Sequence, residues 1–433
     1  MKFTRTELSP NVYLNYAYSE RFKTEGLTLY FLLPLQKETL SADSLLPEVL
    51  RMGCASTPTP RLMARRMQEA YDTSIAVSQY NIGYDKAIVF SADMLSPEFL
   101  PNKLDTLTAA SDFLSDIICR PYKENALLSD KHLALRQKAL IEAVRAEINH
   151  KGTYALLRCR AAMTEGTVTA LLPYGTEEML NAVTPKALTE NYHRLLTDAA
   201  VECFYEGRAP IDEVQGKLAF LKDFGKNYNA RCAPDALPEK KSADIRYIEE
   251  RVAARQGRLV IGLRYSPCKT REEHAAFAVM LEILAYSPIA KLFVRVREAM
   301  GLCYSCSAVN DFTRGLLFLT AGIDNDKSKK VENAMLAQIR QIGRRRFTDN
   351  ECEAAKKSLT ASLAALSDTP DSLELFMLRR RRMGIPTTPE EEITRIEAVS
   401  ASEIAAAARK LSPDTVYFLY AEPSEDGGDA DDE

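Results

Sequence analysis

Histidine is scarce in this sequence, and the few histidines present are poorly placed for a metal site. Only four occur among 433 residues: His132, His150, His193 and His274. No two of them are spaced i, i+4, the separation that puts two ligands on one face of a helix. A catalytic zinc centre needs three protein ligands and an open position. We therefore expect no zinc cofactor and no zinc-dependent hydrolysis from this chain alone.

Long apolar segments and a strong net charge are missing too. No stretch approaches the roughly 18 consecutive apolar residues of a membrane helix, and residues 1–7 show no apolar core of a signal peptide. The formal net charge is −4, which gives no reason to expect a nucleic acid or an acidic membrane as partner. The basic runs Arg344–Arg346 and Arg379–Arg382 are short, and we interpret them as solvated helix faces.

Nine cysteines are scattered along the chain. An odd number of mostly distant cysteines is typical of reduced thiols, so a cytoplasmic location is expected. Cys303 and Cys306 are spaced as C-x-x-C, but they fall in a run predicted as strand. In a strand, positions i and i+3 point to opposite faces. The pattern therefore argues against a redox or zinc role for this pair.

The sequence repeats weakly at long range, which predicts two homologous halves. With 46% hydrophobic residues and this length, the chain exceeds one ordinary core. A helix capped by Thr184 and the strand after it recur in a helix capped by Ser400 and its strand. Each half is predicted to have the element order β-α-β-β-α-α-α-β. This order predicts an α+β fold in which a mixed or antiparallel sheet is covered by helices on one face.

Composition also places the domain boundaries. The first domain is expected over 1–223 and the second over 243–422. Between them, 224–242 contains two prolines and several charges with little apolar periodicity, which is typical of a linker. The last residues, 423–433, are acidic and glycine-rich and are expected to be disordered.

The sharpest local motif lies at the start of the hairpin in the second half. Residues 291–300 read as a helix, and Gly301 suits the left-handed cap that ends it. Such a turn can bring the guanidinium of Arg297 and the hydroxyl of Tyr304 to one edge. Both are donors that could hold a peptide carbonyl or a developing oxyanion. Alternatively, Arg297 makes a structural ion pair and Tyr304 fills the core.

Three segments resemble the insulinase (pitrilysin, inverzincin) family of zinc peptidases, and the resemblance covers nearly the whole chain. Residues 45–53 stand where the family has its metal-binding helix, and residues 62–71 stand where it has the next helix, which precedes a Gly-Gly/Ala turn. Residues 145–148 resemble the segment with the distal glutamate ligand. Residues 292–304 closely match the family pattern Arg-Glu-x-x-Gly-Leu-x-Tyr. The resemblance implies two tandem α+β halves that face each other as a clamshell.

The zinc motif of that family, His-x-x-Glu-His, is absent here. Aligning its glutamate with Glu48 places Leu45 and Val49 at the two histidine positions and Glu147 at the distal ligand. Leucine and valine have no lone pair to donate to a metal, and Pro47 removes an amide donor from the helix. We interpret Glu48 and Glu147 as solvated helix-face charges. The resemblance thus implies a degenerate metal site.

The resemblance implies a non-catalytic subunit of a two-chain zinc peptidase. A homologous HxxEH-bearing partner would bind zinc and cleave a peptide or a small unfolded protein. The resemblance implies a closed chamber between the two chains, in which Arg297 and Tyr304 would face the partner's zinc and position the substrate. The chain also resembles a small bacterial subgroup of inactive members that is associated with 5-aminopentanol modification of elongation factor P, which implies a link to that pathway.

Two other interpretations remain open. The chain could be a peptide-binding or scaffold protein without a proteolytic role, like the silent core subunits of respiratory complexes that share the family's fold. It could also be a self-sufficient enzyme with an unrelated site around Cys54, near Ser56 and Thr57. No histidine is adjacent to Cys54 in sequence, so a structural thiol is expected there.

Overall fold

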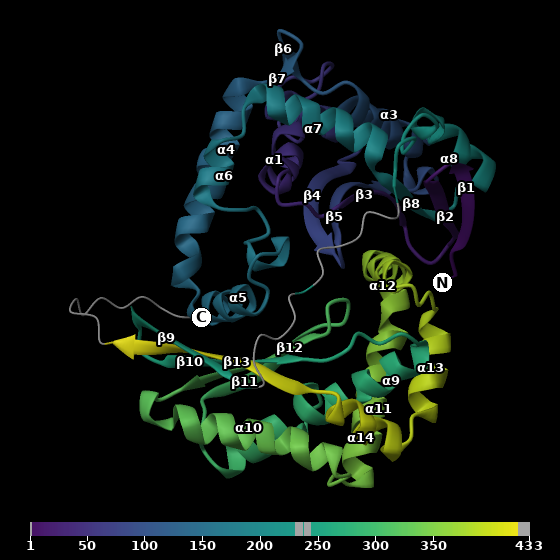
Figure 1. The fold of residues 1–433 in the computed structure, drawn as a ribbon. Helices are drawn as coiled ribbons and strands as arrows, with labels where there is room; N and C mark the ends of the chain where they lie inside the picture. Colours follow the sequence, from purple (N-terminus) through teal and green to yellow (C-terminus); the bar gives the residue numbers. More distant parts are fainter. Residues whose placement is uncertain (1, 230–236, 238–243, 423–433) are drawn as a thin grey trace. The chain divides into compact units, whose positions relative to one another are not determined.

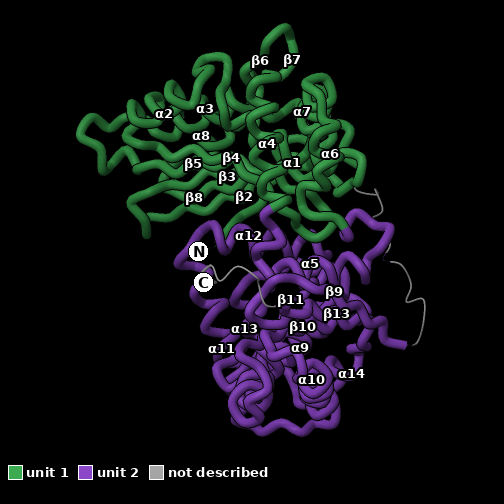
Figure 2. The backbone as a smooth tube through the Cα atoms, turned by 90° about the vertical axis from the view of Figure 1, so that its left-hand side faces the viewer, with its two compact units in different colours: residues 1–145, 171–236 green, residues 146–170, 237–433 purple. Residues whose placement is uncertain are grey.

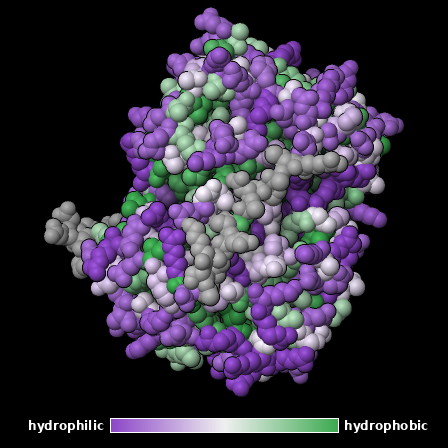
Figure 3. Space-filling model, in the orientation of Figure 1, coloured by the Kyte–Doolittle hydropathy of each residue, from purple (hydrophilic) through white to green (hydrophobic). Residues whose placement is uncertain are grey.

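The computed structural model describes residues 2–229, 237 and 244–422, and Figure 1 shows their fold. No helix in this described part is long and apolar enough to cross a membrane. In the view of Figure 3, hydrophilic residues cover most of the coloured surface and apolar residues show in smaller areas between them. The expected acidic tail, 423–433, lies outside the described residues.

Two compact units make up the chain, and Figure 2 colours them separately. Unit 1 comprises 1–145 and 171–236, and unit 2 comprises 146–170 and 237–433. Each unit has its own sheet and its own apolar core. The prediction of an α+β fold with two similar halves is therefore confirmed.

Unit 1 is built on a six-stranded mixed sheet with the order β1-β2-β8-β3-β5-β4. Its strands are β1 (Thr4–Ser9), β2 (Val12–Tyr18), β3 (Thr24–Pro34), β4 (Ser74–Ile82), β5 (Asp85–Leu95) and β8 (Ala200–Gly207). Only β2 and β8 run parallel. The inner strand β3 is an almost continuous apolar run, as expected for a strand that is buried on both faces of the sheet.

The helices of unit 1 cover the sheet face formed by Leu27, Leu29 and Phe31. They are α1 (Leu40–Leu50), α2 (Pro60–Glu69), α3 (Thr106–Cys119), α4 (Asp130–Ala146), α6 (Glu177–Asn181), α7 (Pro185–Asp198) and α8 (Ile211–Lys217). Two short strands, β6 (Lys123–Glu124) and β7 (Leu127–Leu128), form a small hairpin. Single turns of 3-10 helix are η1 (Pro97–Phe99), η3 (Val168–Ala170, in unit 2) and η4 (Ala219–Leu221). The predicted cap is present, because the Thr184 hydroxyl accepts the Ala187 amide at 3.2 Å.

Unit 2 has a five-stranded sheet with the order β11-β12-β10-β13-β9. Its strands are β9 (Arg246–Ala253), β10 (Gly257–Arg264), β11 (Ser305–Asp311), β12 (Leu316–Ile323) and β13 (Ser412–Glu422). Only β9 and β13 run parallel. Read from β2 and β9, the two sheets have the same strand order and the same parallel pair, which is the repeat that the sequence predicts.

The helices of unit 2 include two π-helical segments, a rare form that often marks functional regions. These are η5 (Glu282–Tyr286) and η6 (Leu292–Ala299). The α-helices are α9 (Arg271–Leu281), α10 (Ser328–Gly343), α11 (Asp349–Ala365), α12 (Pro370–Arg382), α13 (Pro389–Ala398) and α14 (Ala401–Arg409). Short 3-10 turns are η2 (Glu147–Asn149), η7 (Asn325–Lys327) and η8 (Leu366–Asp368). The predicted cap of α14 is a full capping box between Ser400 and Glu403.

One helix from the first half of the sequence belongs to unit 2. Helix α5 (Lys151–Met163) buries Ala155, Cys159 and Met163 against β10, β12 and β13. These three residues are spaced i, i+4, i+8 and form one apolar stripe. The sheet of unit 2 therefore has helical cover on both faces, and the expected first domain, 1–223, differs from unit 1 by the segment 146–170.

The segment expected as a linker begins inside unit 1. Phe224 is buried, and its ring lies 6.0 Å from that of Phe31 and 6.4 Å from that of Phe220. An aromatic ring buried in this way adds to the core. The chain stays in unit 1 beyond Phe224, because the Asn227 amide donates to the Thr197 carbonyl at 2.9 Å. Most of the remaining expected linker lies outside the described residues.

Candidate functional site

The turn that carries Arg297 and Tyr304 has the left-handed cap that the sequence predicts. Gly301 adopts φ +59°, a conformation that favours glycine. Its amide donates to the Arg297 carbonyl at 3.1 Å, and the Tyr304 amide donates to the Gly322 carbonyl of β12 at 2.9 Å. The helix before the turn is π-helical rather than α-helical: the Met300 amide reaches back five residues to Arg295. The wider turn and the glycine cap fix where the helix ends and β11 begins.

Both predicted donors lie on the surface of unit 2. The side chain of Arg297 is 43% exposed, lies 3.5 Å from the Glu298 carboxylate and stacks over the Phe293 ring at 5.0 Å. Tyr304 is 52% exposed, and its hydroxyl donates to Asp324 at 2.8 Å. Within the described residues, the two side chains are not hydrogen-bonded to each other. Tyr304 does not fill the core, and among the described residues Arg297 pairs only with its exposed sequence neighbour Glu298.

Electrostatics keep the Tyr304 phenol in its donor form. The hydrogen bond to Asp324 and the charge of that carboxylate raise the pKa of Tyr304. The phenol therefore stays protonated at neutral pH and keeps a proton to donate. A guanidinium stays charged throughout the physiological range. The turn can thus offer one neutral and one cationic donor to a carbonyl or an oxyanion.

The cysteine pair beside this turn is arranged differently from the sequence prediction. The thiols of Cys303 and Cys306 are hydrogen-bonded to each other, so they do not point to opposite faces. The reason is that β11 begins only at Ser305, which leaves Cys303 in the turn and outside the alternation of the strand. The hydrogen bond from Cys306 and the positive charge of Arg297 lower the pKa of Cys303. The prediction that the two thiols point to opposite faces is therefore wrong.

The two positions predicted to correspond to zinc-binding histidines lie in the core. Leu45 and Val49 are both buried on the inner face of α1, among the residues of the unit 1 core. Helix α1 continues past Pro47, and the Arg51 amide donates to the Pro47 carbonyl at 3.1 Å. The predicted disturbance at the proline therefore does not end the helix. The helix is intact here, but its inner face carries no side chain that could bind a metal.

The two glutamates of the degenerate site are also engaged elsewhere. Glu48 is partly buried; its carboxylate accepts from Arg51 at 2.5 Å and lies 3.9 Å from the Arg136 guanidinium of α4. Glu147 belongs to unit 2 by its contacts, where its charge acts on Arg160. Glu48 is thus held between two cations rather than freely solvated. Both cations approach the same carboxylate oxygen of Glu48, Oε2.

The donor set does not fit the zinc ion that the resemblance implies for active relatives. Among the described residues, no group of three or more His, Cys, Asp or Glu side chains lies close enough to hold a metal ion. Two apolar side chains and a carboxylate paired with arginines replace the usual ligands. No step of a mechanism is therefore assigned to a metal bound by this chain.

A buried lysine next to these positions was missed from the sequence. Lys86, in β5, is fully buried and donates to the Ser44 hydroxyl and the Pro173 carbonyl, each at 3.0 Å. Burial lowers its pKa to about 8, against the opposing effect of the nearby Asp43 carboxylate. The only sequence signal is a lysine at an inward position of a strand that alternates. The buried ammonium group of Lys86 thus contacts Ser44, the residue that directly precedes Leu45.

Comparison with known proteins gives this geometry its context. Residues 182–359 match the family model described as "Peptidase M16 inactive domain". The chain is 23% identical over 405 residues to the "Probable inactive metalloprotease YmfF" of Bacillus subtilis (strain 168), covering 93% of this chain and 94% of that relative.

Solved structures show the same fold. A conserved protein from Enterococcus faecalis V583 is 23% identical with a TM-score of 0.88, over 98% of this chain and 100% of that one. The peptidase M16 inactive domain from Pseudomonas fluorescens is 13% identical with a TM-score of 0.79, again over 98% and 100%. At sequence identities this low, the structural similarity establishes that the fold is shared.

Proposed function

We propose that this chain, an inactive homologue of the M16 (insulinase) peptidases, is the non-catalytic subunit of a two-chain metallopeptidase. A homologous partner with an intact HxxEH motif would bind zinc and hydrolyse a peptide or a small unfolded protein. This chain would supply Arg297 and Tyr304 to position that substrate. The eight described cysteines are free thiols, which supports a reducing compartment such as the cytoplasm for the pair.

One contrast carries the proposal. The metal positions Leu45 and Val49 are buried as core residues, whereas Arg297 and Tyr304 remain exposed on a turn with a specific backbone geometry. Neither donor is buried, and the glycine-capped turn distinguishes them from other exposed arginines and tyrosines of the unit. The exposure of both donors supports a role toward a bound molecule.

The proposed chemistry uses only the donors of this chain. When a substrate carbonyl enters, the Tyr304 hydroxyl would exchange its bond to Asp324 for one to that oxygen. The Arg297 guanidinium would add a charged hydrogen bond, which strengthens as negative charge develops on the oxygen. Hydrolysis itself, including the activation of water, would occur at the partner's metal.

Reconstitution with a homologous HxxEH subunit tests this function. Arg297→Ala and Tyr304→Phe should each lower kcat of the pair by about 10²–10³, the effect of removing one oxyanion donor. Peptide hydrolysis by the mixed subunits measures it, with the unmixed chain as baseline.

Two matched substitutions serve as controls in the same unit. Tyr247 is 55% exposed and donates to Glu332 at 2.9 Å, and Arg251 is exposed and pairs with Glu422 at 3.1 Å. Tyr247→Phe and Arg251→Ala should leave kcat unchanged. Full activity of both Arg297→Ala and Tyr304→Phe would reject the positioning role and favour the peptide-binding or scaffold alternative.

A further inference from the structure

A polar hollow of about 460 Å³ lies within unit 2, away from the residues of the proposed function. It is bounded by η6, the C-terminal half of α10 and the turn that leads into α11. Arg297 and Tyr304 do not line it. The volume falls within the range of roughly 300–1,000 Å³ that is typical of small-molecule sites.

The charges around the hollow are mostly positive. Lys291 is only 4% exposed, and its ammonium group lies 2.8 Å from the Glu351 carboxylate, so these two charges offset each other. Arg295 and Arg346 also line the hollow, and within the described residues neither has a carboxylate partner. Two uncompensated guanidinium groups therefore face one cavity. They favour an occupant with negative charge.

A buried amide at the wall lacks a partner. Gln338 is 2% exposed, and its Nε2 donates to the Ala334 carbonyl of its own helix at 3.3 Å. Its Oε1 is buried and has no hydrogen-bond partner among the described residues. Buried side-chain amides nearly always find partners, so an orphan atom at a cavity wall indicates a missing polar neighbour. Rotation of the amide by 180° would replace this acceptor with an N–H donor, and the bond to Ala334 would then be given up for one to the ligand.

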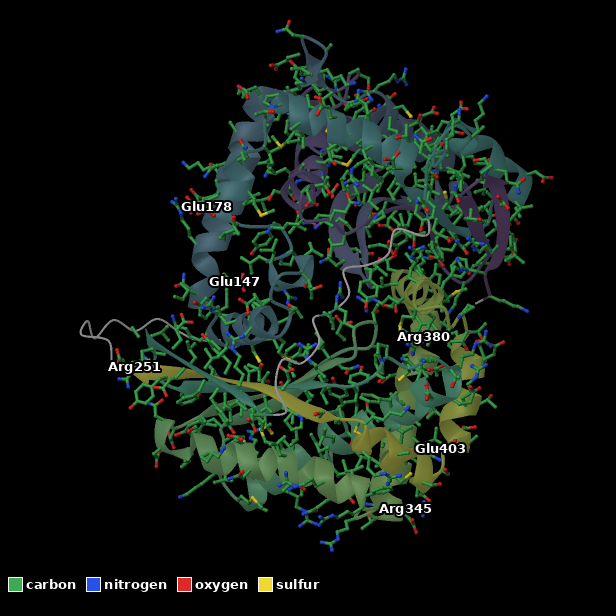
Figure 4. The ribbon with its side chains drawn as sticks, viewed as in Figure 1. Glu147, Glu178, Arg251, Arg345, Arg380 and Glu403 are labelled. Carbon is green, nitrogen blue, oxygen red and sulfur yellow. The ribbon has the colours of Figure 1, made fainter. Side chains whose placement is uncertain are left out.

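Backbone geometry brings Arg346 to the hollow. Helix α10 ends in a Schellman turn: the Arg346 amide donates to the Gln341 carbonyl at 2.8 Å and the Arg345 amide to Ile342 at 2.9 Å. Arg345 adopts φ +58°, a left-handed conformation that is unfavourable for residues other than glycine. Figure 4 labels Arg345 at this end of the helix. The basic run Arg344–Arg346 is predicted from the sequence to be a solvated helix face. In the structure Arg346 lines the hollow, whereas Arg344 and Arg345 do not.

The start of α11 closes one side of the hollow. This helix begins after Thr348, which lines the hollow, and its first turn carries the carboxylates of Asp349 and Glu351. The positive charge of the site therefore comes from the arginines and not from the end of this helix. Met300 and Phe347 supply the apolar part of the lining. A ligand with an anionic group and a small apolar body would match both parts.

We propose that this hollow binds a small oxyanion, a carboxylate or phosphate group, between the guanidinium groups of Arg295 and Arg346. Gln338 would hydrogen-bond the same ligand. Planar guanidinium groups hold both kinds of anion through paired hydrogen bonds. The site is a property of this chain alone and does not depend on a peptidase partner.

Calorimetric titration of the full chain with sodium phosphate, and separately with sodium glutarate, tests the site. Sodium chloride at matched ionic strength is the reference in each case. We expect saturable binding of at least one anion, and the one that binds assigns the site to phosphate or carboxylate ligands. Arg295→Gln and Arg346→Gln should each raise Kd about tenfold or more, equivalent to about 1.4 kcal/mol.

Arg344→Gln is the matched control, because it removes the same charge from the same run without touching the hollow. Its Kd should equal that of the unaltered chain. The proposal is overturned if neither anion binds more tightly than chloride. It is also overturned if Arg344→Gln weakens binding as much as Arg346→Gln, since the attraction would then be a general effect of charge.

Discussion

The ammonium group of Lys86 lies 3.0 Å from the hydroxyl of Ser44, and both residues are fully buried in unit 1. The same ammonium donates to the Pro173 carbonyl, which joins β5, α1 and the segment before α6. Ser44 directly precedes Leu45, the first of the two positions predicted to correspond to zinc-binding histidines. This part of α1 is therefore packed and hydrogen-bonded as core, with a cation of the protein's own inside it.

The pH dependence of stability should report Lys86. Its folded pKa of about 8 lies below the ordinary value of 10.5, because burial disfavours the charged form. The unfolded chain thus binds more protons between these values, and stability rises as pH increases from about 8 to 10.5. The gain should approach about 3 kcal/mol. Urea unfolding across this range measures it.

Substitution isolates the contribution of that lysine from other groups that titrate at high pH. Lys86→Met should remove the rise, whereas the same change at the exposed Lys131 should leave it intact. Equal pH profiles for the unaltered chain and Lys86→Met would contradict the prediction.

Restoring histidines at the former ligand positions should not restore zinc binding. In Leu45→His/Val49→His, two imidazoles would occupy core sites, and Glu48 would remain paired with Arg51. Each unsatisfied buried polar group costs about 1–3 kcal/mol. We expect a lower Tm and no bound zinc by elemental analysis. Stoichiometric zinc with an unchanged Tm would show that the metal site is intact apart from its two histidines.

Stability at mildly acidic pH should depend on His274. This buried ring lies between Glu392, 3.2 Å from Nδ1, and Arg380, whose Nη1 lies 2.6 Å from Nε2. Burial, assisted by Arg380, lowers the pKa of His274, although Glu392 opposes the shift. The unfolded histidine takes up its proton near pH 6.5. Stability should therefore be present above that pH and be lost as pH falls below it.

Denaturation midpoints between pH 5 and 8 test this dependence. The window stays above the range in which Glu392 titrates, because its own pKa is lowered from 4.5. His274→Gln should flatten the profile, and His193→Gln should preserve it. A profile that stays steep in His274→Gln would assign the effect to another group.

The paired thiols near the candidate site should differ in reactivity. Because the pKa of Cys303 is lowered by Cys306 and Arg297, and that of Cys306 is raised by Cys303, Cys303 should be alkylated first by iodoacetamide at neutral pH. Arg297→Ala should slow this reaction, and Arg251→Ala should not. Peptide mass spectrometry after timed alkylation measures both rates. Equal rates for the two thiols would contradict the prediction.

The candidate site was partly predictable because some of its features are local. The glycine cap at Gly301 follows from one residue's access to positive φ, and the caps at Thr184 and Ser400 follow from a hydroxyl near free amides. The loss of metal ligands at Leu45 and Val49 is a matter of residue chemistry alone. Such features need no knowledge of distant neighbours.

Other features depend on contacts between residues that are distant in sequence. The pairing of Glu48 with Arg136, the burial of Lys86 beside Ser44, and the hollow where η6 meets α10 and α11 are of this kind. The meeting of Cys303 with Cys306 depended on where the strand begins, and strand boundaries are fixed by pairing with β12.

The sequence by itself determined that the chain has two related α+β halves, lacks a helical two-histidine zinc motif and keeps an Arg/Tyr turn. Periodicity, capping and side-chain chemistry act over a few residues and can be recognised from the sequence alone. Only the tertiary structure decided that α5 packs with unit 2 and which charges are buried or paired. Burial and pairing depend on the three-dimensional neighbours of each group, and these neighbours set both its pKa and its availability to a ligand.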